Sequence, residues 1–359
     1  MSDKIKNIVV TITFFGVIVI LLLANIIKKD GQISISERRK LEQFPAFSIT
    51  KLFNGTFLDK MDKYLTDQFI KREEFRRLKI GMEFNVLKKK DYNKLYKYND
   101  YIIEQNYPLD KKSVFNLINK LKQIKDDYLT EQNNIYFTII PDKNYFVNDD
   151  NLKLDYDELK NIMNSNLDIK YIDIFNELSL EDYYKTDTHW REERLSKVVN
   201  KLSKEMNFNI TNNYNFKRIS DFNGTYSSRI VRKDIKDEIY ILDNVNDINV
   251  YNYETNGYEK VYDLIKLNSL DKYNVYLSGS VSLLKIESMN TDSAKDLIVF
   301  RDSYGSSLIP LMMNGYKSIT VVDTRYISPS MLSNYIDFNN KDILFLYSTL
   351  LINDSFTLK

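Results

Sequence analysis

Cysteine is absent from the 359 residues, so the chain has no disulfide bond, no thiolate metal site and no cysteine nucleophile. Histidine occurs once, which excludes every site that needs two imidazoles. Glycine occurs only nine times, and the sequence contains neither a P-loop nor a GxGxxG pattern, so phosphate-cradling loops are poorly supported. The chemistry left to this chain is that of one imidazole, hydroxyl groups, carboxylates and amines.

An excess of one charge sign is also missing. Lys and Arg together number 51 and Asp and Glu 50, for a formal net charge of +1. Proteins that bind nucleic acid usually carry a basic excess, so we expect no nucleic-acid partner. The single histidine and scattered carboxylates form no recognisable ligand set, and we expect neither a metal nor another cofactor.

The first 30 residues contain one long apolar run, IVVTITFFGVIVILLLANII at 8–27. About 20 uncharged residues are enough to cross a bilayer core. A cleavable signal peptide is the alternative, but no clean small-x-small site follows Ala24, so a retained anchor is favoured. Lysines flank both ends and do not decide the orientation. The short N-terminal tail favours a single-pass cell-membrane protein with an extracytoplasmic body.

The remainder divides by its periodicity. Residues 31–100 are predicted to form a helical neck, because Leu58, Met61, Leu65 and Phe69 recur at helical spacing. From residue 101, short apolar runs alternate with helical patterns, which indicates a mostly parallel sheet flanked by helices. The predicted strands are 134–140, 170–175, 296–300, 318–322 and 342–346, and the predicted helices include 114–124, 157–164 and 195–206.

Residues 207–275 break this alternation. An alternating run at 248–254 is followed by the turn residues Asn256 and Gly257 and by a second run at 258–265, which is typical of a β-hairpin. We therefore expect a β-rich insertion at 207–275 inside an α/β domain formed by 101–206 and 276–359.

Two features carry chemistry. Asp187 lies two residues before His189, so in extended chain its carboxylate faces the imidazole and can orient it. A helix expected near Arg191 would place a positive dipole end beside His189. Ser303 follows the predicted strand 296–300, at a strand-to-helix corner where α/β sites form. Each feature has a structural alternative, a packed histidine or a helix-capping serine, but a serine nucleophile needs a base and the chain offers one imidazole.

Further side chains are candidates for substrate contact. Lys143 and Arg325 follow predicted strands at the same sheet edge and can bind a sugar hydroxyl, a carboxylate or the acyl carbonyl; the alternative is an ion pair with Asp142 or Asp323. Trp190, the single tryptophan, can stack on a sugar ring or belong to the core.

Six motifs in fixed order resemble the bacterial DHHW family, which is similar to the alginate O-acetyltransferase proteins of the SGNH-hydrolase-like superfamily. The resemblance covers nearly the whole chain. The motifs are Glu37-Arg38-Arg39-Lys40-Leu41 with Phe44-Pro45, Tyr64-Leu65-Thr66-Asp67-Gln68-Phe69-Ile70-Lys71-Arg72, Pro141-Asp142-Lys143, Tyr184-Lys185-Thr186-Asp187-Thr188-His189-Trp190, Asp302-Ser303-Tyr304, and Val322-Asp323-Thr324-Arg325-Tyr326.

The resemblance implies Asp187 as orienting acid, His189 as base and Ser303 as nucleophile, in a permuted SGNH-like order. Geometry and not chain order defines such a site. Tyr304 joins the substrate-contact candidates. Two departures stand out: Thr188 stands where the family's name motif has the first of its two histidines, and Ser280 replaces an asparagine after Gly279, the other candidate oxyanion donor.

The expected function is a membrane-anchored serine O-acetyltransferase that modifies an exported polysaccharide through an acetyl-Ser303 intermediate. The resemblance further implies a partner membrane acyltransferase that supplies acetyl groups. A carbohydrate acetylesterase with the same three residues remains open, as does a non-catalytic polysaccharide-binding scaffold of the envelope.

Overall fold

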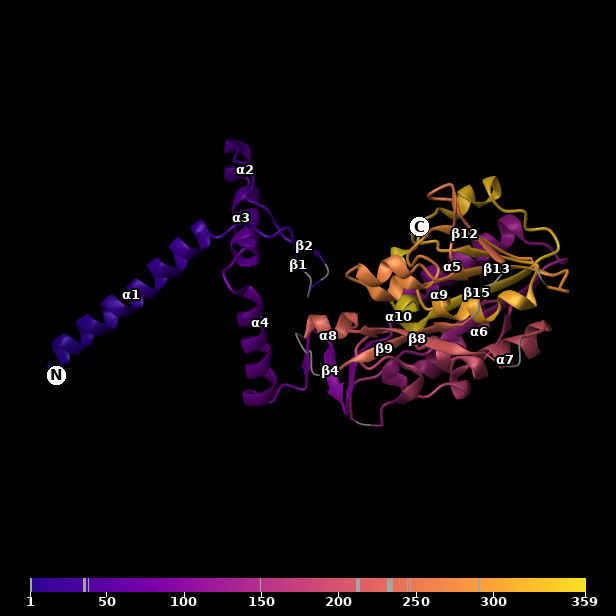
Figure 1. The fold of residues 1–359 in the computed structure, drawn as a ribbon, viewed down its shortest axis with the longest axis horizontal. Helices are drawn as coiled ribbons and strands as arrows, with labels where there is room; N and C mark the ends of the chain where they lie inside the picture. Colours follow the sequence, from indigo (N-terminus) through magenta and orange to yellow (C-terminus); the bar gives the residue numbers. More distant parts are fainter. Residues whose placement is uncertain are drawn as a thin grey trace. The chain divides into compact units, whose positions relative to one another are not determined.

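The computed structural model describes residues 2–34, 37, 39–148, 150–210, 214–230, 235–243, 245, 247–289 and 291–359. It divides into two compact units, Met1–Tyr92 with Ser228–Arg232, and Asn93–Ser227 with Lys233–Lys359. The division falls at Tyr92, whereas the sequence suggested boundaries after residues 30 and 100. Figure 1 shows the elements of both units along the chain.

The first unit is helical. It contains α1 (Asp3–Ile27), α2 (Ile49–Phe53), α3 (Thr56–Asp67) and α4 (Arg72–Gly81), continued by a π-helical turn at Met82–Val86, and the short strands β1 (Ile33–Ser34), β2 (Arg39–Lys40) and β3 (Asp91–Tyr92). Helix α1 has no buried residue, and among the described residues it alone is long and apolar enough to cross a membrane. The helices expected in the neck are present as α3 and α4.

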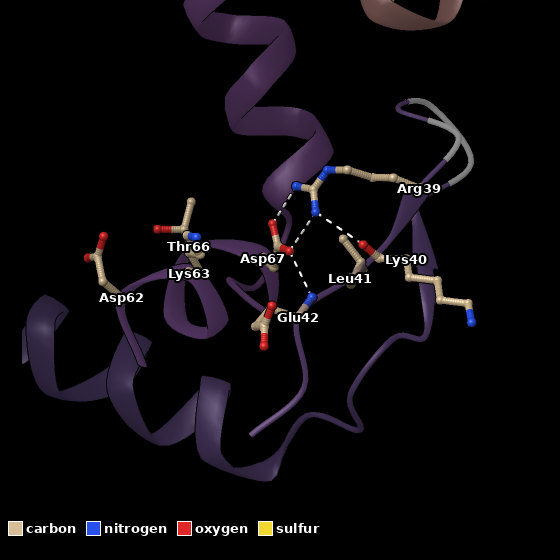
Figure 2. A pocket seen from close by; sticks show the side chains of 8 residues that line it. All are labelled: Arg39, Lys40, Leu41, Glu42, Asp62, Lys63, Thr66 and Asp67. Carbon is tan, nitrogen blue, oxygen red and sulfur yellow. Dashed lines mark hydrogen bonds and ion pairs between the residues drawn. The ribbon is translucent and has the colours of Figure 1, made fainter. Parts of the chain in front are cut away.

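The first unit is held together by residues of the two N-terminal motifs. The guanidinium of Arg39 donates to both carboxylate oxygens of Asp67, at 2.7 and 2.6 Å, and this contact lowers the pKa of Asp67 (Figure 2). Gln68 bonds both backbone groups of Gly31, at 2.8 and 2.9 Å. Asn25 in α1 accepts from the N–H of Ile70 at 2.7 Å. The two motifs therefore join α1 to the end of α3.

The second unit contains an eight-stranded sheet in the order β11-β10-β12-β14-β13-β15-β6-β7. The strands β14, β13, β15, β6 and β7 are parallel, and β12, β10 and β11 add an antiparallel edge. Their bounds are β6 (Asn134–Ile140), β7 (Lys170–Tyr171), β10 (Ile248–Asn252), β11 (Gly257–Glu259), β12 (Leu283–Ser288), β13 (Asp296–Arg301), β14 (Ser318–Val322) and β15 (Asp342–Ser348). The predicted mixed α/β class with a mostly parallel sheet is confirmed.

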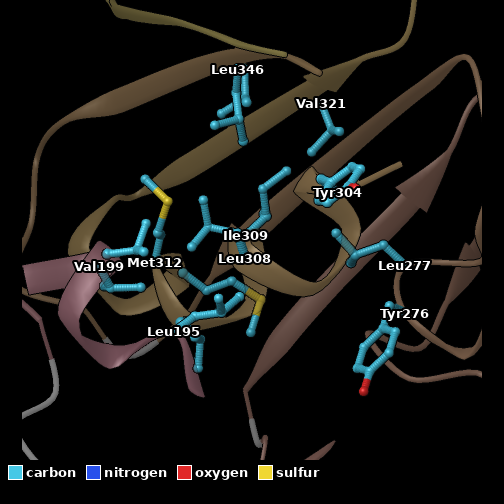
Figure 3. Close-up of a cluster of buried hydrophobic side chains, with 14 of the residues drawn as sticks. Leu195, Val199, Tyr276, Leu277, Tyr304, Leu308, Ile309, Met312, Val321 and Leu346 are labelled. Carbon is cyan, nitrogen blue, oxygen red and sulfur yellow. The ribbon is translucent and has the colours of Figure 1, made fainter. Parts of the chain in front are cut away.

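Helices cover both faces of this sheet. They are α5 (Lys111–Tyr128), α6 (Tyr156–Asn166), α7 (Ser196–Met206), α9 (Gly305–Leu308) and α10 (Thr349–Ile352). Outside this sheet, β4 (Leu95–Tyr98) and β5 (Tyr101–Glu104) pair as an antiparallel hairpin. Because side chains alternate along a buried strand, Leu344 of β15 packs with α7 and α9 while Phe345 packs with α5 and α6. Figure 3 shows part of the buried cluster to which Leu344 belongs. In it, Leu308 and Ile309 point towards Val199 and Leu346.

The described strands of the region 207–275 belong to two sheets, a two-stranded one and the main sheet. Strands β8 (Phe216–Phe222) and β9 (Asp237–Leu242) form a hairpin, with α8 (Thr225–Arg229) between them. The predicted hairpin is confirmed as β10 and β11, but it extends the main sheet through β12 and its second strand ends at Glu259. The strand expected at 170–175 is also shorter, since within it only Lys170 and Tyr171 (β7) pair with β6 and Phe175 begins a 3₁₀ turn.

The packing of β15 predicts that Leu344→Ala destabilises the second unit, because Leu344 is fully buried in the sheet core. The free energy of unfolding should fall by about 2–5 kcal/mol, from lost apolar burial and the cavity left behind. Denaturant unfolding of the full chain measures it. Leu344→Met, which keeps the volume, should cost less than about 1.5 kcal/mol. Equal costs for the two variants would contradict this account of the core.

Candidate functional site

Ser303 stands two residues beyond the end of β13, at the carboxyl edge of the parallel strands. Asp302 holds this corner, because its carboxylate accepts from the N–H of Tyr304 at 3.0 Å and from the N–H of Ser348 at 2.8 Å. Ser348 ends β15, the neighbouring parallel strand. Ser303 is partly exposed, whereas Asp302 and Tyr304 are buried. The corner thus presents the hydroxyl of Ser303 at the surface of an otherwise buried turn.

His189 links Ser303 to Asp187. Its Nε2 lies 2.8 Å from the Oγ of Ser303, and its Nδ1 lies 2.6 Å from Oδ1 of Asp187. The imidazole is 7% exposed and Asp187 is fully buried. The backbone N–H of His189 also donates to Asp187, at 3.2 Å. The structure therefore brings the three expected residues into one hydrogen-bonded chain, in which Asp187 sets the imidazole orientation and Nε2 faces the serine hydroxyl.

The second oxygen of Asp187 is held by a residue that sequence reasoning missed. Thr225 donates to Oδ2 through its N–H at 2.7 Å and its hydroxyl at 2.9 Å. Gly224 makes this approach possible, because a Cβ at that position would lie 2.4 Å from both Cβ of Asp187 and the carbonyl oxygen of Thr186. A glycine before a threonine in an irregular segment is too common a pattern to have identified this contact.

A second unforeseen residue, Asp237 of β9, fixes the segment that carries Asp187 and His189. Its carboxylate accepts from the N–H of Lys185 at 2.8 Å and from the N–H and hydroxyl of Thr186 at 2.7 and 2.5 Å. The segment is closed by an antiparallel bridge between Tyr183 and Trp190. The region expected to be an insertion thus supplies Asp237 and Thr225 to the support of the site.

Lys143 has internal partners only. Its ammonium group is buried and donates to the carbonyl oxygens of Ile102, Tyr184 and Lys185, at 2.5, 3.0 and 3.4 Å. Burial lowers the pKa of Lys143 to about 7, while the negative charge of Asp187 opposes that shift. Two of these acceptors belong to the segment that carries His189 and the third to β5, so the structure does not present Lys143 to a substrate.

Arg325 forms an ion pair with Asp323, the alternative to substrate contact that the sequence also allowed. Its Nε and Nη2 donate to the two oxygens of Asp323, at 2.9 and 2.6 Å. Asp323 also pairs with the buried Arg301 at 3.3 Å. The side chain of Arg325 remains 21% exposed, so it is paired and still reachable from solvent.

The aromatic candidates for substrate contact are buried. Trp190 is fully buried, and its Nε1–H donates to the carbonyl oxygen of Tyr304 at 2.9 Å. The hydroxyl of Tyr304 donates to the carbonyl oxygen of Thr188 at 2.7 Å. Both residues join the histidine segment to the serine turn from within the core. Neither offers a ring face to a sugar, and the suggestion of sugar stacking at Trp190 is corrected accordingly.

The expected oxyanion donors are placed differently. The N–H of Gly279 already donates to the carbonyl oxygen of Tyr276 at 3.0 Å, and the carbonyl oxygen of Gly279 accepts from Arg301 at 3.0 Å. Gly279 has a φ of +77°, and a Cβ there would lie 2.2 Å from Asn274. Ser280 is exposed. Within the described ranges no acceptor is found for the N–H of Ser303, which leaves this group available to a developing oxyanion.

The helix dipole expected beside His189 is not formed. Helix α7 begins at Ser196, and residues Glu192–Arg194 form a 3₁₀ turn before it. The orientation of His189 therefore rests on Asp187 and packing. No group of three or more His, Asp or Glu suited to a metal ion is found among the residues that the structure describes.

Comparison with known proteins identifies the fold. No protein-family model and no curated protein matches the sequence. A solved DHHW family protein from Eubacterium siraeum superposes with a TM-score of 0.61 at 17% identity, over 73% of this chain and 93% of that chain. Bacillus cereus PatB1 with a sulfonyl adduct superposes with a TM-score of 0.54 at 15% identity, over 72% of this chain and 97% of that chain. The O-acetyltransferase domain of Pseudomonas putida AlgJ gives 0.43 at 10%, over 71% and 90%. The resemblance to the DHHW family is thus confirmed at the level of the fold.

The burial of Lys143 predicts a specific pH dependence of stability. Because its pKa is lowered from 10.5 to about 7 in the folded chain, the unfolded chain binds more protons between these values. The free energy of unfolding should therefore gain a contribution as pH rises from about 7 to about 10, with a slope of up to about 1.4 kcal/mol per pH unit. This contribution is lost again as pH falls from about 10 to about 7, and below about 7 the slope vanishes because both states bind the proton.

Denaturant unfolding across this pH range, compared between the wild type and Lys143→Met, isolates the contribution. The Lys143→Met variant should lack it, and the exposed Lys197→Met should keep it. The same pH slope in wild type and Lys143→Met would show that Lys143 titrates normally.

Proposed function

We propose that this chain is a membrane-anchored serine O-acetyltransferase that modifies an exported or cell-surface polysaccharide through an acetyl-Ser303 intermediate. Ser303 is the nucleophile, His189 the general base and Asp187 the orienting acid of an SGNH-hydrolase-like domain. The single observation that carries the proposal is the hydrogen-bonded chain from Asp187 through His189 to Ser303, with contacts of 2.6 and 2.8 Å.

The two half-reactions follow from this geometry. In the first, the Oγ of Ser303 attacks the carbonyl carbon of an acetyl donor while His189 takes the hydroxyl proton through Nε2. The carbon–leaving-group bond breaks, and His189 returns the proton to the leaving group. In the second, His189 takes the proton of a sugar hydroxyl, whose oxygen attacks the acetyl carbonyl. The bond to Ser303 breaks, and the proton returns to Oγ.

Charge develops at two places in each half-reaction. The imidazolium is stabilised by Asp187, whose second oxygen is held by Thr225. The carbonyl oxygen becomes negative, and the N–H of Ser303 is the donor we assign to it. Ser280 is exposed and remains a candidate second donor.

The acceptor, the donor and the location are assigned on more general grounds. The sequence resemblance to polysaccharide acetylation proteins supports a sugar hydroxyl as the acceptor. The same resemblance suggests a partner membrane acyltransferase as the source of acetyl groups. Helix α1 supports a single membrane anchor, and we assign the body to the outside of the cytoplasmic membrane. PatB1, whose fold is similar, was solved with a sulfonyl adduct.

The proposal predicts that the full chain in detergent, mixed with 4-nitrophenyl acetate, gains one acetyl group at Ser303. Ser303→Ala should gain none, and its rate of ester cleavage should fall roughly 10³-fold or more, because the nucleophile is lost. Intact mass and peptide mapping locate the adduct. Ser306→Ala is the matched control, since the buried hydroxyl of Ser306 has no hydrogen-bond partner within the described residues.

Oligosaccharides added to the acetylated chain separate the remaining functions. Acetyl transfer to a sugar hydroxyl supports the transferase, and release as acetate alone supports an acetylesterase. A folded chain that neither cleaves the ester nor carries the adduct would contradict Ser303 as nucleophile and leave the binding scaffold.

A further inference from the structure

The imidazole of His189 lies flat against a second ring. Tyr273 stacks on it with ring centroids 3.7 Å apart and an interplanar angle of 8°. Tyr273 belongs to a 3₁₀ turn at Lys272–Val275, at the end of the region expected to be an insertion, and it is 2% exposed. No sequence motif pointed to it. The stack covers one face of the ring whose two nitrogens contact Asp187 and Ser303.

Tyr273 is itself fixed from both ends. Its N–H donates to the side chain of Asp271 at 3.2 Å, which caps the turn. Its hydroxyl lies 2.8 Å from the Oγ of Ser307. Ser307 is four residues after Ser303, in the short helix α9. One tyrosine therefore connects the base to the helix that follows the nucleophile.

Tyr304 is a second aromatic neighbour of the imidazole, with ring centroids 5.0 Å apart and an interplanar angle of 55°. Of these two tyrosines, only Tyr273 lies parallel to His189. The other aromatic neighbours of Tyr273 are inclined, with Tyr276 at 58° and Tyr184 at 87°. Ordinary core packing in this cluster is inclined, so the parallel stack is a distinct feature of the Tyr273–His189 pair.

A parallel aromatic face has two effects on an imidazole. It blocks rotation of the ring out of the plane in which Nδ1 meets Asp187 and Nε2 meets Ser303. Its π-electrons also attract a cation, so they stabilise imidazolium more than neutral imidazole, and more strongly where water is excluded. Asp187 contacts the imidazole directly, and the buried amine of Lys143 interacts with Asp187. Asp187, Arg301 and Asp302 are the charged groups that act on Tyr273.

We infer that Tyr273 is a positioning residue for the proposed acyl transfer: its ring holds His189 in line with Ser303 and stabilises the imidazolium that forms when His189 takes the serine proton. The inference rests on the proposed function, because it assigns His189 the role of base. It gives the segment 272–275 a part in the reaction without contact to substrate.

Sulfonylation tests the inference without an acetyl donor or a sugar. Phenylmethanesulfonyl fluoride reacts by forming a bond between sulfur and the Oγ of Ser303; the sulfur–fluorine bond breaks, fluoride leaves, and the hydroxyl proton passes to His189 and then to water. The rate on the full chain in detergent is followed by intact mass. Tyr273→Leu should react about 10-fold to 100-fold more slowly than wild type, with unchanged half-saturation by the reagent.

Two further variants separate the ring from the hydroxyl. Tyr273→Phe keeps the stack and should react within about threefold of wild type, as should Ser307→Ala, which removes the same hydrogen bond from its other end. Replacement of Tyr273 by pentafluorophenylalanine keeps the shape but not the negative ring face. It should react at least about 10-fold more slowly than Tyr273→Phe, and it decides the question should Tyr273→Leu fail to fold.

The single histidine supplies an independent signature. Its ring protons give one set of NMR signals, shifted upfield by the current of the Tyr273 ring. They should stay in place in Tyr273→Phe and move downfield in Tyr273→Leu. Wild-type rates in both the Leu and the pentafluorophenylalanine variants would overturn the inference alone, since Ser303 still reacts. A wild-type chain that is never sulfonylated at Ser303 would overturn the proposed function and with it this inference.

Discussion

The buried carboxylate of Asp187 is the constraint on which the site depends. A charge removed from water must be compensated by hydrogen bonds, and Asp187 receives them from His189 on one oxygen and from Thr225 on the other. These bonds fix the imidazole tautomer and direct Nε2 at Ser303. Gly224 fits here because it lacks a Cβ, which would lie 2.4 Å from the Cβ of Asp187 and from the carbonyl oxygen of Thr186. The backbone at Gly224 therefore packs directly against the segment that carries Asp187.

The segment 184–189, which carries Asp187 and His189, is also bound by two residues far from it in sequence. Asp237 accepts from the N–H groups of Lys185 and Thr186, and the buried amine of Lys143 donates to the carbonyl oxygens of Tyr184 and Lys185. With a pKa of about 7, Lys143 carries only part of a charge near neutral pH. Its contribution is mainly geometric. Lys143 of the Pro141-Asp142-Lys143 motif thus supports the segment that carries His189.

In the first unit, residues of the two N-terminal motifs also bind one another through polar side chains. Arg39 comes from one motif and Asp67 from the other, and their bidentate pair is reinforced by Arg72 bonding Glu37 at 2.7 Å. Gln68 accepts from the N–H of Gly31, which follows α1, and Asn25 of α1 accepts from the N–H of Ile70, which follows α3. Few apolar side chains are buried there, so polar contacts hold this part of the chain together. The residues of the two N-terminal motifs thus have a structural role, because they join α1 to the end of α3.

Periodicity alone determined the class of the fold and most of its parallel strands, because a buried strand must be continuously apolar and a surface helix must repeat near 3.6 residues. The bounds of β6 and the cores of β13, β14 and β15 agree with that prediction. The candidate residues Asp187, His189 and Ser303 could also be predicted, since the composition left one imidazole and the pattern placed a serine at a strand-to-helix corner. Burial could not be predicted: from the sequence, Trp190 and Lys143 look like substrate contacts, and only the tertiary structure shows them enclosed. Thr225, Asp237 and Tyr273 acquire their roles only by folding back from residues 207–275, because contacts between segments far apart in sequence leave no local pattern.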